Sequence, residues 1–330
     1  MKIKKYYPIS QSPFYKLSNH KVLCKILGVE LPTLKKILKR GDNNYWTGEV
    51  KKDDKKAKSR EIEVPKSQLH RIHRRINLLL SRIETPDYLV SGVKGRSHVF
   101  NADLHRGDLA VAKADIKKFY PSTNISMVKS GFKKVFRMAD DIAETLSKIC
   151  VYDGHIPTGS PLSQSLSFIL NKPIFDHINY YSKSRGLKFS LYVDDLTFSG
   201  KMIPKYFLEY LKKYFKKNKG YVLHKFRTYN SSTEKIVTGV VIKGNKLTLK
   251  KSQRFKIKKL RDSYLFYSDP AKINEEKTII FFQRYLGHLF SAAQIIPRYK
   301  QIGKRVAKRR SDLGVKALNQ HTKKLIKVEN

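Results

Sequence analysis

The sequence predicts an α+β fold in which helices accompany an antiparallel sheet. One observation is a hairpin pattern at residues 188–199, where two apolar, β-prone runs flank an Asp-Asp pair. Another is the helical spacing of apolar residues between Ser67 and Ile83. The chain has 330 residues, of which 40% are hydrophobic, so it is long enough for a sizeable core shared by two or three subdomains.

The other elements are predicted from local patterns along the chain. A helix at 31–38 has Pro32 near its start and Gly41 after its end, positions at which these residues are favoured. Residues 51–56 form a charged run typical of a solvated loop, and an edge strand at 60–65 follows and ends in proline. Further expected elements are a buried strand at 109–114, helices around 142–149, 163–174 and 206–215, strands at 236–242 and 247–249 joined through Gly244-Asn245, and a mainly helical, basic segment from residue 250 onward.

The helix expected from Ser67 to Ile83 has an apolar face and a basic face. The basic face carries five residues, which are His70, Arg71, His73, Arg74 and Arg75. Such a face is usually a solvated surface, and the charge of this chain adds the alternative that it contacts phosphate. We therefore expect both histidines to be surface residues rather than metal ligands.

The charge of the chain indicates a polyanionic partner. It has 69 Lys+Arg against 27 Asp+Glu, a net charge of +42, and these cations are interleaved with 19 Tyr and 17 Phe. Bases stack on aromatic rings and phosphates pair with cations, so this composition is typical of nucleic-acid binding. A basic protein of the membrane surface is the alternative, but no amphipathic anchor is evident.

The cellular compartment is predicted from cysteine usage and hydropathy. Cys24 and Cys150 are the two cysteines and form no Cys-x-x-Cys motif, which suits a reducing cytosol. No apolar run reaches transmembrane length. We expect a soluble, cytoplasmic protein without a membrane partner.

The carboxylates of the predicted hairpin carry the chemical interpretation. Asp-Asp is a common turn dipeptide, and the pairs Asp53-Asp54 and Asp140-Asp141 suit a solvated loop and a helix start. Asp194-Asp195 lies between two apolar strands, where its charges repel each other and a divalent cation would relieve the repulsion. By itself this pair supports a metal site and an ordinary turn equally.

A third carboxylate favours the metal site. Asp115 ends the buried strand at 109–114 and is followed by Phe119 and Tyr120. Three carboxylates can hold two metal ions roughly 3.5–4 Å apart, the arrangement that promotes in-line phosphoryl displacement. With the basic composition, this predicts a polymerase or a nuclease.

Two loops could contact a nucleotide. The loop at 91–97 contains Gly92, Gly95 and Arg96, and glycines allow close backbone approach while an arginine can bind phosphate. The loop at 156–161 precedes a helix start and contains Gly159 and two hydroxyl residues. Either loop alone is a weak signal.

Five short motifs together resemble the reverse transcriptases of bacterial retrons. Tyr192–Asp195 resembles the Tyr-x-Asp-Asp box of reverse transcriptases, Asp115–Ser122 their first metal-binding motif, and Pro157–Ser163 their nucleotide-site loop. Asn101–His105 is similar to the Asn-Ala-x-x-His element of the retron enzymes, and Val237–Gly239 to their Val-Thr-Gly triplet. The resemblance spans roughly residues 60 to 250.

The resemblance implies a right-hand polymerase fold with fingers, a palm built on an antiparallel sheet, and a helical thumb. On this basis residues 59–110 are the fingers, 111–249 the palm with inserted helices, and 250–330 a basic thumb, preceded by a helical appendage at 1–58. It also implies an RNA-directed DNA polymerase that uses dNTPs and two Mg²⁺ ions. Such an enzyme copies a cognate structured non-coding RNA into a branched RNA–DNA hybrid, primed from a guanosine 2′-OH, and serves in anti-phage defence beside a separate effector protein.

The same resemblance assigns roles to individual residues. It implies that Asp115, Asp194 and Asp195 are catalytic and bind the metal ions, with the carbonyl of Ile116 as a further ligand. The residues implied for nucleotide binding are Arg60, Arg96, Tyr120, Thr158, Gly159 and Arg227, with Tyr120 crowding the sugar 2′-OH. The residues implied for RNA binding are Asn101, Ala102, His105, Val237, Thr238 and Gly239.

The chain departs from the family pattern at four positions. Thr158 replaces a common Gln, Gln164 a common Pro, His224 an Asn and Arg227 a Lys, which puts the role of Arg227 as a proton donor to pyrophosphate in question. All three metal-binding carboxylates are kept. Alternatives are another bacterial reverse transcriptase of the group II intron or abortive-infection type, a two-metal nuclease, or an RNA-binding scaffold with a vestigial polymerase site. A nuclease would need neither Tyr120 nor the 157–163 loop.

Overall fold

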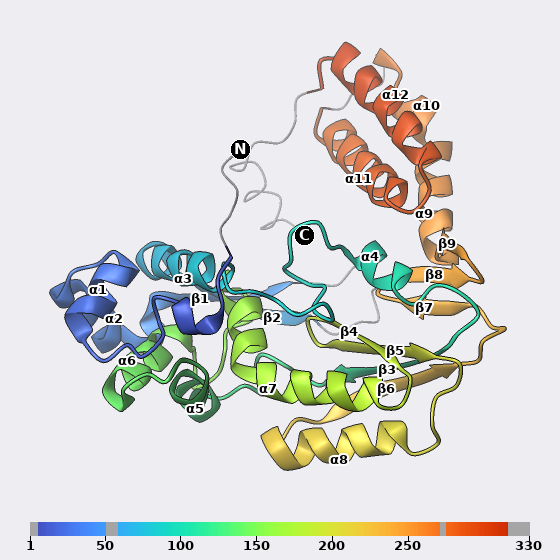
Figure 1. Cartoon of the computed structure of the whole chain (residues 1–330). Helices are drawn as coiled ribbons and strands as arrows, with labels where there is room; N and C mark the ends of the chain where they lie inside the picture. Colours follow the sequence, from blue (N-terminus) through green and yellow to red (C-terminus); the bar gives the residue numbers. More distant parts are fainter. Residues whose placement is uncertain (1–5, 51–58, 271–274, 316–330) are drawn as a thin grey trace. The chain divides into compact units, whose positions relative to one another are not determined.

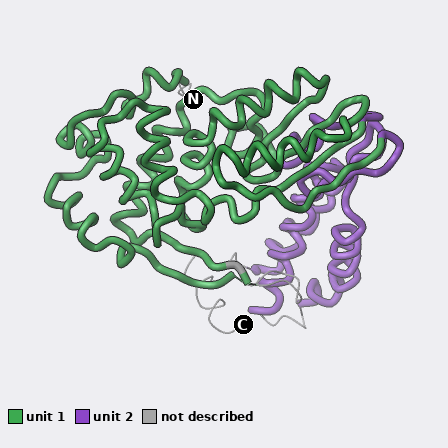
Figure 2. Tube along the Cα trace, turned by 90° about the horizontal axis from the view of Figure 1, so that it is seen from below, with its two compact units in different colours: residues 1–97, 110–230 green, residues 98–109, 231–330 purple. Residues whose placement is uncertain are grey.

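A computed structural model describes residues 6–50, 59–270 and 275–315 of the chain (Figure 1). These residues divide into two compact units (Figure 2). The first contains residues 1–97 and 110–230, and the second contains residues 98–109 and 231–330. The second unit therefore takes a short segment from the middle of the chain.

The N-terminal part of the first unit contains helices and a two-stranded sheet. Its elements are η1 (Ile9–Gln11), α1 (His20–Leu27), α2 (Leu31–Arg40), η2 (Gly41–Asn44), β1 (Tyr45–Val50), β2 (Arg60–Pro65) and α3 (Ser67–Leu80). Asn19 caps α1 by accepting from the backbone N–H groups of Lys21 and Val22. Strands β1 and β2 pair antiparallel, with Tyr45 opposite Pro65.

The rest of the first unit is built on a four-stranded antiparallel sheet. Its strands are β3 (Ala110–Ile116), β4 (Lys188–Tyr192), β5 (Asp195–Gly200) and β6 (Leu223–Tyr229), in the spatial order β4-β5-β3-β6. The accompanying helices are α5 (Ile125–Phe136), α6 (Asp140–Cys150), α7 (Ser163–Lys183) and α8 (Phe207–Lys219). Helix α7 packs against β4 and α8 against β6, so both lie on one face of the sheet (Figure 1).

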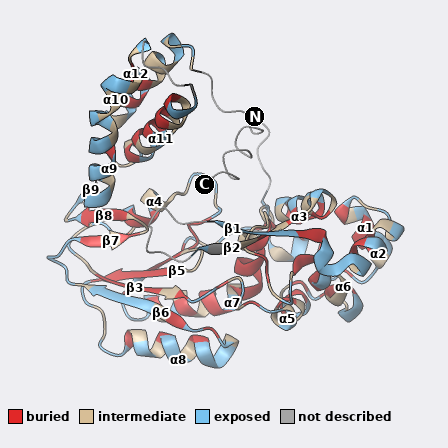
Figure 3. Cartoon of the chain, turned by 180° about the vertical axis from the view of Figure 1, so that it is seen from behind, coloured by how far each residue is buried: buried red, intermediate tan, exposed pale blue. Residues whose placement is uncertain are grey.

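The side chains of β3 alternate between the two faces of this sheet. Ala112, Ala114 and Ile116 are buried, whereas Lys113 and Asp115 are only half-buried. Because successive residues of a strand point to opposite faces, Asp115 lies on the face away from the core. The strands also differ as wholes, since β5 is almost entirely buried and β6 is largely exposed (Figure 3).

The second unit combines a three-stranded antiparallel sheet with helices. Its elements are α4 (His98–Asp103), β7 (Lys235–Val237), β8 (Val240–Lys243), β9 (Lys246–Leu249), α9 (Lys251–Asp262), α10 (Tyr264–Tyr267), α11 (Glu275–Ala293) and α12 (Arg298–Asp312). Helix α4 contacts β7 and β8. The helical core is formed by Ile257, Phe282, Tyr285, Leu289 and Val306.

The structure confirms the predicted mixture of helices and antiparallel sheet, with the hairpin, the edge strand and the turn at Gly244-Asn245 where they were expected. The charged run at 51–56 and the residues after 315 lie outside the described part of the chain. Within the described residues, no helix combines the length and apolar composition needed to cross a membrane. The division into appendage, fingers, palm and thumb stays a prediction.

One prediction about the basic helix was wrong. His73, expected on the surface of α3, is 0% exposed. It follows Leu69 by four residues and precedes Ile76 by three, so it lies on the same helical face as these buried residues.

Candidate active site

Three aspartates meet at the end of two neighbouring strands. Asp115 of β3 is the register partner of Asp195 of β5, and the backbone N–H of Ile116 donates to the carbonyl of Asp194 at 3.0 Å. Asp194 itself lies in the turn between β4 and β5. The sheet register therefore sets Asp115 opposite Asp195, and Asp194 is near enough to both for their charges to act on it.

Burial and mutual repulsion perturb this group. Burial, together with the negative charges of Asp115 and Asp195, raises the pKa of Asp194 to about 6, against an opposing effect of Lys225. A carboxyl group whose ionised form is disfavoured by its neighbours gains from a nearby cation. The electrostatics of the turn thus favour a positively charged ligand.

Two basic side chains from β6 bind the carboxylate of Asp115. His224 donates from Nε2 to Oδ1, and Lys225 donates from Nζ to Oδ2 at 3.0 Å. Consecutive strand residues normally point to opposite faces, but here the register shifts between the partners of Lys113 and Asp115, and Lys225 has φ 52°. This β-bulge lets both side chains reach the same carboxylate, a contact that the sequence analysis missed.

The chemistry of these residues fits a hard divalent cation, although their contacts in this structure are with protein cations. Carboxylate oxygens are the ligands that Mg²⁺ prefers. Among the residues that the structure describes, no three His, Cys, Asp or Glu side chains are grouped as ligands of one ion. Asp115 would exchange its bonds to His224 and Lys225 for bonds to a metal.

The predicted nucleotide loop at 157–163 is attached to β2 through a buried glutamate. Glu63, which is 7% exposed, accepts from the backbone N–H of Thr158 at 2.6 Å and from its hydroxyl at 2.8 Å. The carbonyl of Glu63 accepts from Gly159 N–H at 3.1 Å, and a Cβ atom on Gly159 would lie only 2.7 Å from that oxygen. Glycine is therefore required for this close approach.

His73 holds the same loop from α3. Its Nδ1 accepts from the Ser160 hydroxyl at 2.7 Å, and its Nε2 donates to the Ile149 carbonyl at 2.8 Å. Burial lowers the pKa of His73 to about 4. The neutral ring suits both bonds, since one nitrogen must accept and the other donate.

The remaining residues predicted for nucleotide binding lie in different settings. Tyr120 is half-buried in the turn after β3, with its ring 5.8 Å from that of Phe119. Arg96 donates from Nη1 to the carbonyls of Pro86, Asp87 and Leu89. Arg227 is exposed on β6 opposite Lys113, and Arg60 is the first residue of β2.

The two elements predicted to bind RNA lie together in the second unit. Thr238 and Gly239 form a two-residue turn between β7 and β8 with φ values of 41° and 88°, the pattern of a type I′ hairpin. Thr238 donates from its hydroxyl to the His98 carbonyl at 2.7 Å and accepts from Asn101 Nδ2 at 3.5 Å. The Val-Thr-Gly triplet therefore has a structural role in joining this turn to α4.

Most side chains of these two elements are buried. Asn101, Ala102, His105 and Val237 are each 0% exposed, whereas Thr238 and Gly239 are half-buried. In this structure the buried four shape the surface around the turn and do not themselves face solvent.

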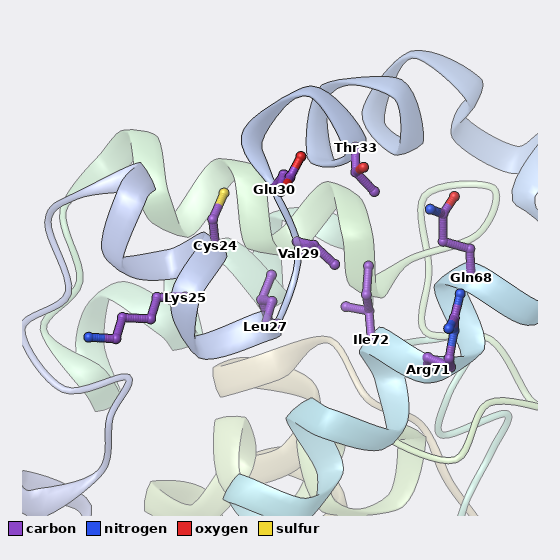
Figure 4. A pocket seen from close by; sticks show the side chains of 10 residues that line it. Cys24, Lys25, Leu27, Val29, Glu30, Thr33, Gln68, Arg71 and Ile72 are labelled. Carbon is purple, nitrogen blue, oxygen red and sulfur yellow. The ribbon is translucent and has the colours of Figure 1, made fainter.

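A cleft of about 560 Å³ lies in the first unit among α1, α2 and α3 (Figure 4). Its lining includes Cys24, Lys25, Glu30, Thr33 and Arg71. It contains none of the residues predicted for catalysis or nucleotide binding.

Comparison with known proteins supports the resemblance seen in the motifs. No protein-family model matches the chain. It is 33% identical to the Retron Se72 reverse transcriptase of Salmonella heidelberg over 181 residues, which cover 54% of this chain and 47% of the relative. It is 26% identical to the Retron Ec86 reverse transcriptase of Escherichia coli over 192 residues, which cover 57% and 59%. The chain thus spans about half the length of the curated relatives it matches.

Two solved structures share a general likeness with the chain. A telomerase from Candida albicans in complex with a fragment of telomeric RNA has a TM-score of 0.48 and 10% identity, covering 84% of this chain and 57% of its own. A foamy viral protease-reverse transcriptase in complex with double-stranded DNA has a TM-score of 0.44 and 16% identity, covering 96% and 49%. The sequence matches, rather than these structures, confirm that across about half of its length the chain is a relative of retron reverse transcriptases.

Proposed function

We propose that this protein is an RNA-directed DNA polymerase of the retron type. The observation that carries the proposal is the strand register that sets Asp115 beside Asp194-Asp195, in a chain related to retron reverse transcriptases. The four-stranded sheet of the first unit then corresponds to the palm of a right-hand polymerase, and the helices of the second unit to its thumb.

The aspartates would hold two Mg²⁺ ions, with the carbonyl of Ile116 as a further ligand. When bound, these ions would supply charge stabilisation to the attacking and leaving oxygens as a 3′-OH, or a 2′-OH at initiation, displaces pyrophosphate from a dNTP. Before the ions bind, His224 and Lys225 hold the carboxylate of Asp115 and offset its charge. Glu63 and His73 fix the 157–163 loop, on which Thr158 and Gly159 contact the nucleotide, and Tyr120 crowds the 2′ position of its sugar.

The template is a cognate structured RNA, and its copying gives a branched RNA–DNA hybrid primed from a guanosine 2′-OH. Support comes from the net charge of +42 and from the joined elements at 101–105 and 237–239. We extend the proposal to a role in anti-phage defence in the cytoplasm beside a separate effector protein, by analogy with the family.

The test is incorporation of labelled dNTPs by purified protein on its co-purified RNA and on a generic primed template. Asp194→Asn and Asp195→Asn should each reduce incorporation by at least about a thousandfold while RNA binding persists. The matched control is Asp141→Asn, which alters the second residue of another Asp-Asp pair, at the start of α6. Full synthesis by Asp194→Asn would contradict the proposal.

A scaffold with a vestigial site is the second candidate. It is favoured by the contacts of Asp115, whose two oxygens are occupied by His224 and Lys225. In that case the unaltered protein would bind its RNA, yet no DNA would co-purify with it and none would be made in the assay.

A further inference from the structure

The turn that carries Asp194 contains a strained valine. Val193 has φ 61°, a left-handed conformation that is a genuine outlier for a β-branched residue. It directly precedes Asp194 and lies between the ends of β4 and β5. Such conformations persist only where the surroundings hold them, and they cluster at functional sites.

Ser91 supplies a contact that holds this valine. Its Oγ accepts a hydrogen bond from the backbone N–H of Val193 at 2.8 Å, and its side chain is 5% exposed. Removing the hydroxyl would leave the Val193 N–H without this acceptor in a partly buried position. Val193 would then relieve its backbone strain by returning to negative φ. This change would turn the Asp194 carboxylate away from Asp115.

The segment around Ser91 is itself fixed to the sheet and to α7. Leu191 donates from its N–H to the Tyr88 carbonyl at 2.7 Å, and the N–H of Val90 donates to the Leu191 carbonyl at 3.0 Å. On its other side, Gly92 packs so closely on Gln164 that a Cβ atom there would lie 2.8 Å from Nε2. Gln164 is the second residue of α7, directly after the nucleotide loop.

We propose that Ser91 is a positioning residue for DNA synthesis, which keeps Val193 in its left-handed conformation and thereby fixes Asp194. The inference rests on the proposed polymerase function.

The variants separate the hydrogen bond from general stability. Ser91→Ala removes the acceptor, Ser91→Thr keeps a hydroxyl, and Val193→Gly removes the steric cost of positive φ. The matched control is Ser147→Ala, because the buried Ser147 hydroxyl also bonds to the backbone, at the Ala143 carbonyl, but within α6.

Steady-state kinetics should show a loss in kcat rather than in KM. Ser91→Ala should lower kcat by about tenfold or more while KM for the dNTP changes by less than about twofold, because a misplaced carboxylate affects the reacting geometry. In the Val193→Gly background, Ser91→Ala should lower kcat by less than about threefold, since glycine adopts positive φ without the serine. The kcat and KM of Ser91→Thr and of Ser147→Ala should stay close to those of the unaltered protein.

Amide hydrogen exchange reports the contact independently of activity. In peptides that contain Val193, Ser91→Ala should raise the exchange rate by about tenfold or more, whereas Ser147→Ala should leave it unchanged. Equal losses of kcat in the valine and glycine backgrounds, or unchanged exchange in Ser91→Ala, would overturn the proposal. If the unaltered protein makes no DNA, the polymerase function fails, whereas the exchange experiment still decides whether Ser91 holds the turn.

Discussion

Glu63 and Thr158 are joined by two hydrogen bonds across 95 residues of sequence. The buried carboxylate on β2 accepts from both the backbone N–H and the hydroxyl of Thr158, at 2.6 and 2.8 Å. The nucleotide loop therefore depends on β2 for its position.

Replacing this carboxylate should weaken nucleotide binding. Glu63→Ala removes the oxygen, Oε2, that accepts from both donors of Thr158, so we expect KM for the dNTP to rise about tenfold with a smaller change in kcat. Steady-state kinetics on a primed template would measure both. Glu61→Ala is the matched control, because Glu61 is exposed on the same strand and contacts Thr158 through its backbone carbonyl. Similar effects of the two substitutions would argue against the role of Glu63.

The buried His73 should make stability depend on pH. Its folded-state pKa of about 4 lies below the ordinary value of 6.5, so the unfolded chain binds the proton more readily. Stability is therefore full above about pH 6.5 and falls, by up to about 3 kcal/mol, as the pH drops toward 4. Urea unfolding at several pH values should show this loss, and His73→Gln should show a smaller one. An identical pH dependence in both proteins would count against His73 as the source.

The ring of Tyr120 should select against ribonucleotides. Tyr120→Ala opens space beside the sugar, so the ratio of kcat/KM for rNTP over dNTP should rise by about ten- to a hundredfold. Tyr120→Phe keeps the ring and should preserve the selectivity of the unaltered protein. If Tyr120→Ala leaves this ratio unchanged, the residue is no sugar gate.

The turn at Thr238 should matter for the cognate RNA more than for other templates. Thr238→Ala removes the bond to the His98 carbonyl and loosens the β7–β8 turn from α4. Affinity for the cognate RNA should fall about tenfold, whereas affinity for a generic primed template should change little. Thr238→Ser keeps the hydroxyl and should retain the affinity of the unaltered protein for the cognate RNA. Binding titrations with both nucleic acids test this, and equal losses on both would refute recognition through the turn.

The local sequence predicted those features that depend on alternation and turn chemistry. The apolar runs around Asp194-Asp195 indicated the hairpin of β4 and β5. The apolar run before Asp115 indicated β3, the strand that pairs with β5. His73 was misplaced because it directly precedes Arg74 and Arg75, although its spacing from Leu69 and Ile76 matches the buried face. Counting the apolar positions alone would have found it.

Other contacts had no local signal. Glu63 alternates with apolar neighbours as a solvent-facing strand residue would, and the approach of His155 and of the 157–163 loop covers it. The bulge at Lys225 occurs without a glycine, so nothing in its sequence predicts that two consecutive side chains reach Asp115. The contact between Ser91 and Val193 likewise depends on tertiary packing.

That bulge has a consequence for how the site tolerates mutation. Because His224 and Lys225 reach Asp115 only through one extra residue in β6, deletion of a single codon there would restore regular alternation and turn one of the two cations to the opposite face. Insertions and deletions in β6 are therefore more damaging than most substitutions. The neutralisation of the Asp115 carboxylate therefore depends on the number of residues in β6 as well as on the identities of His224 and Lys225.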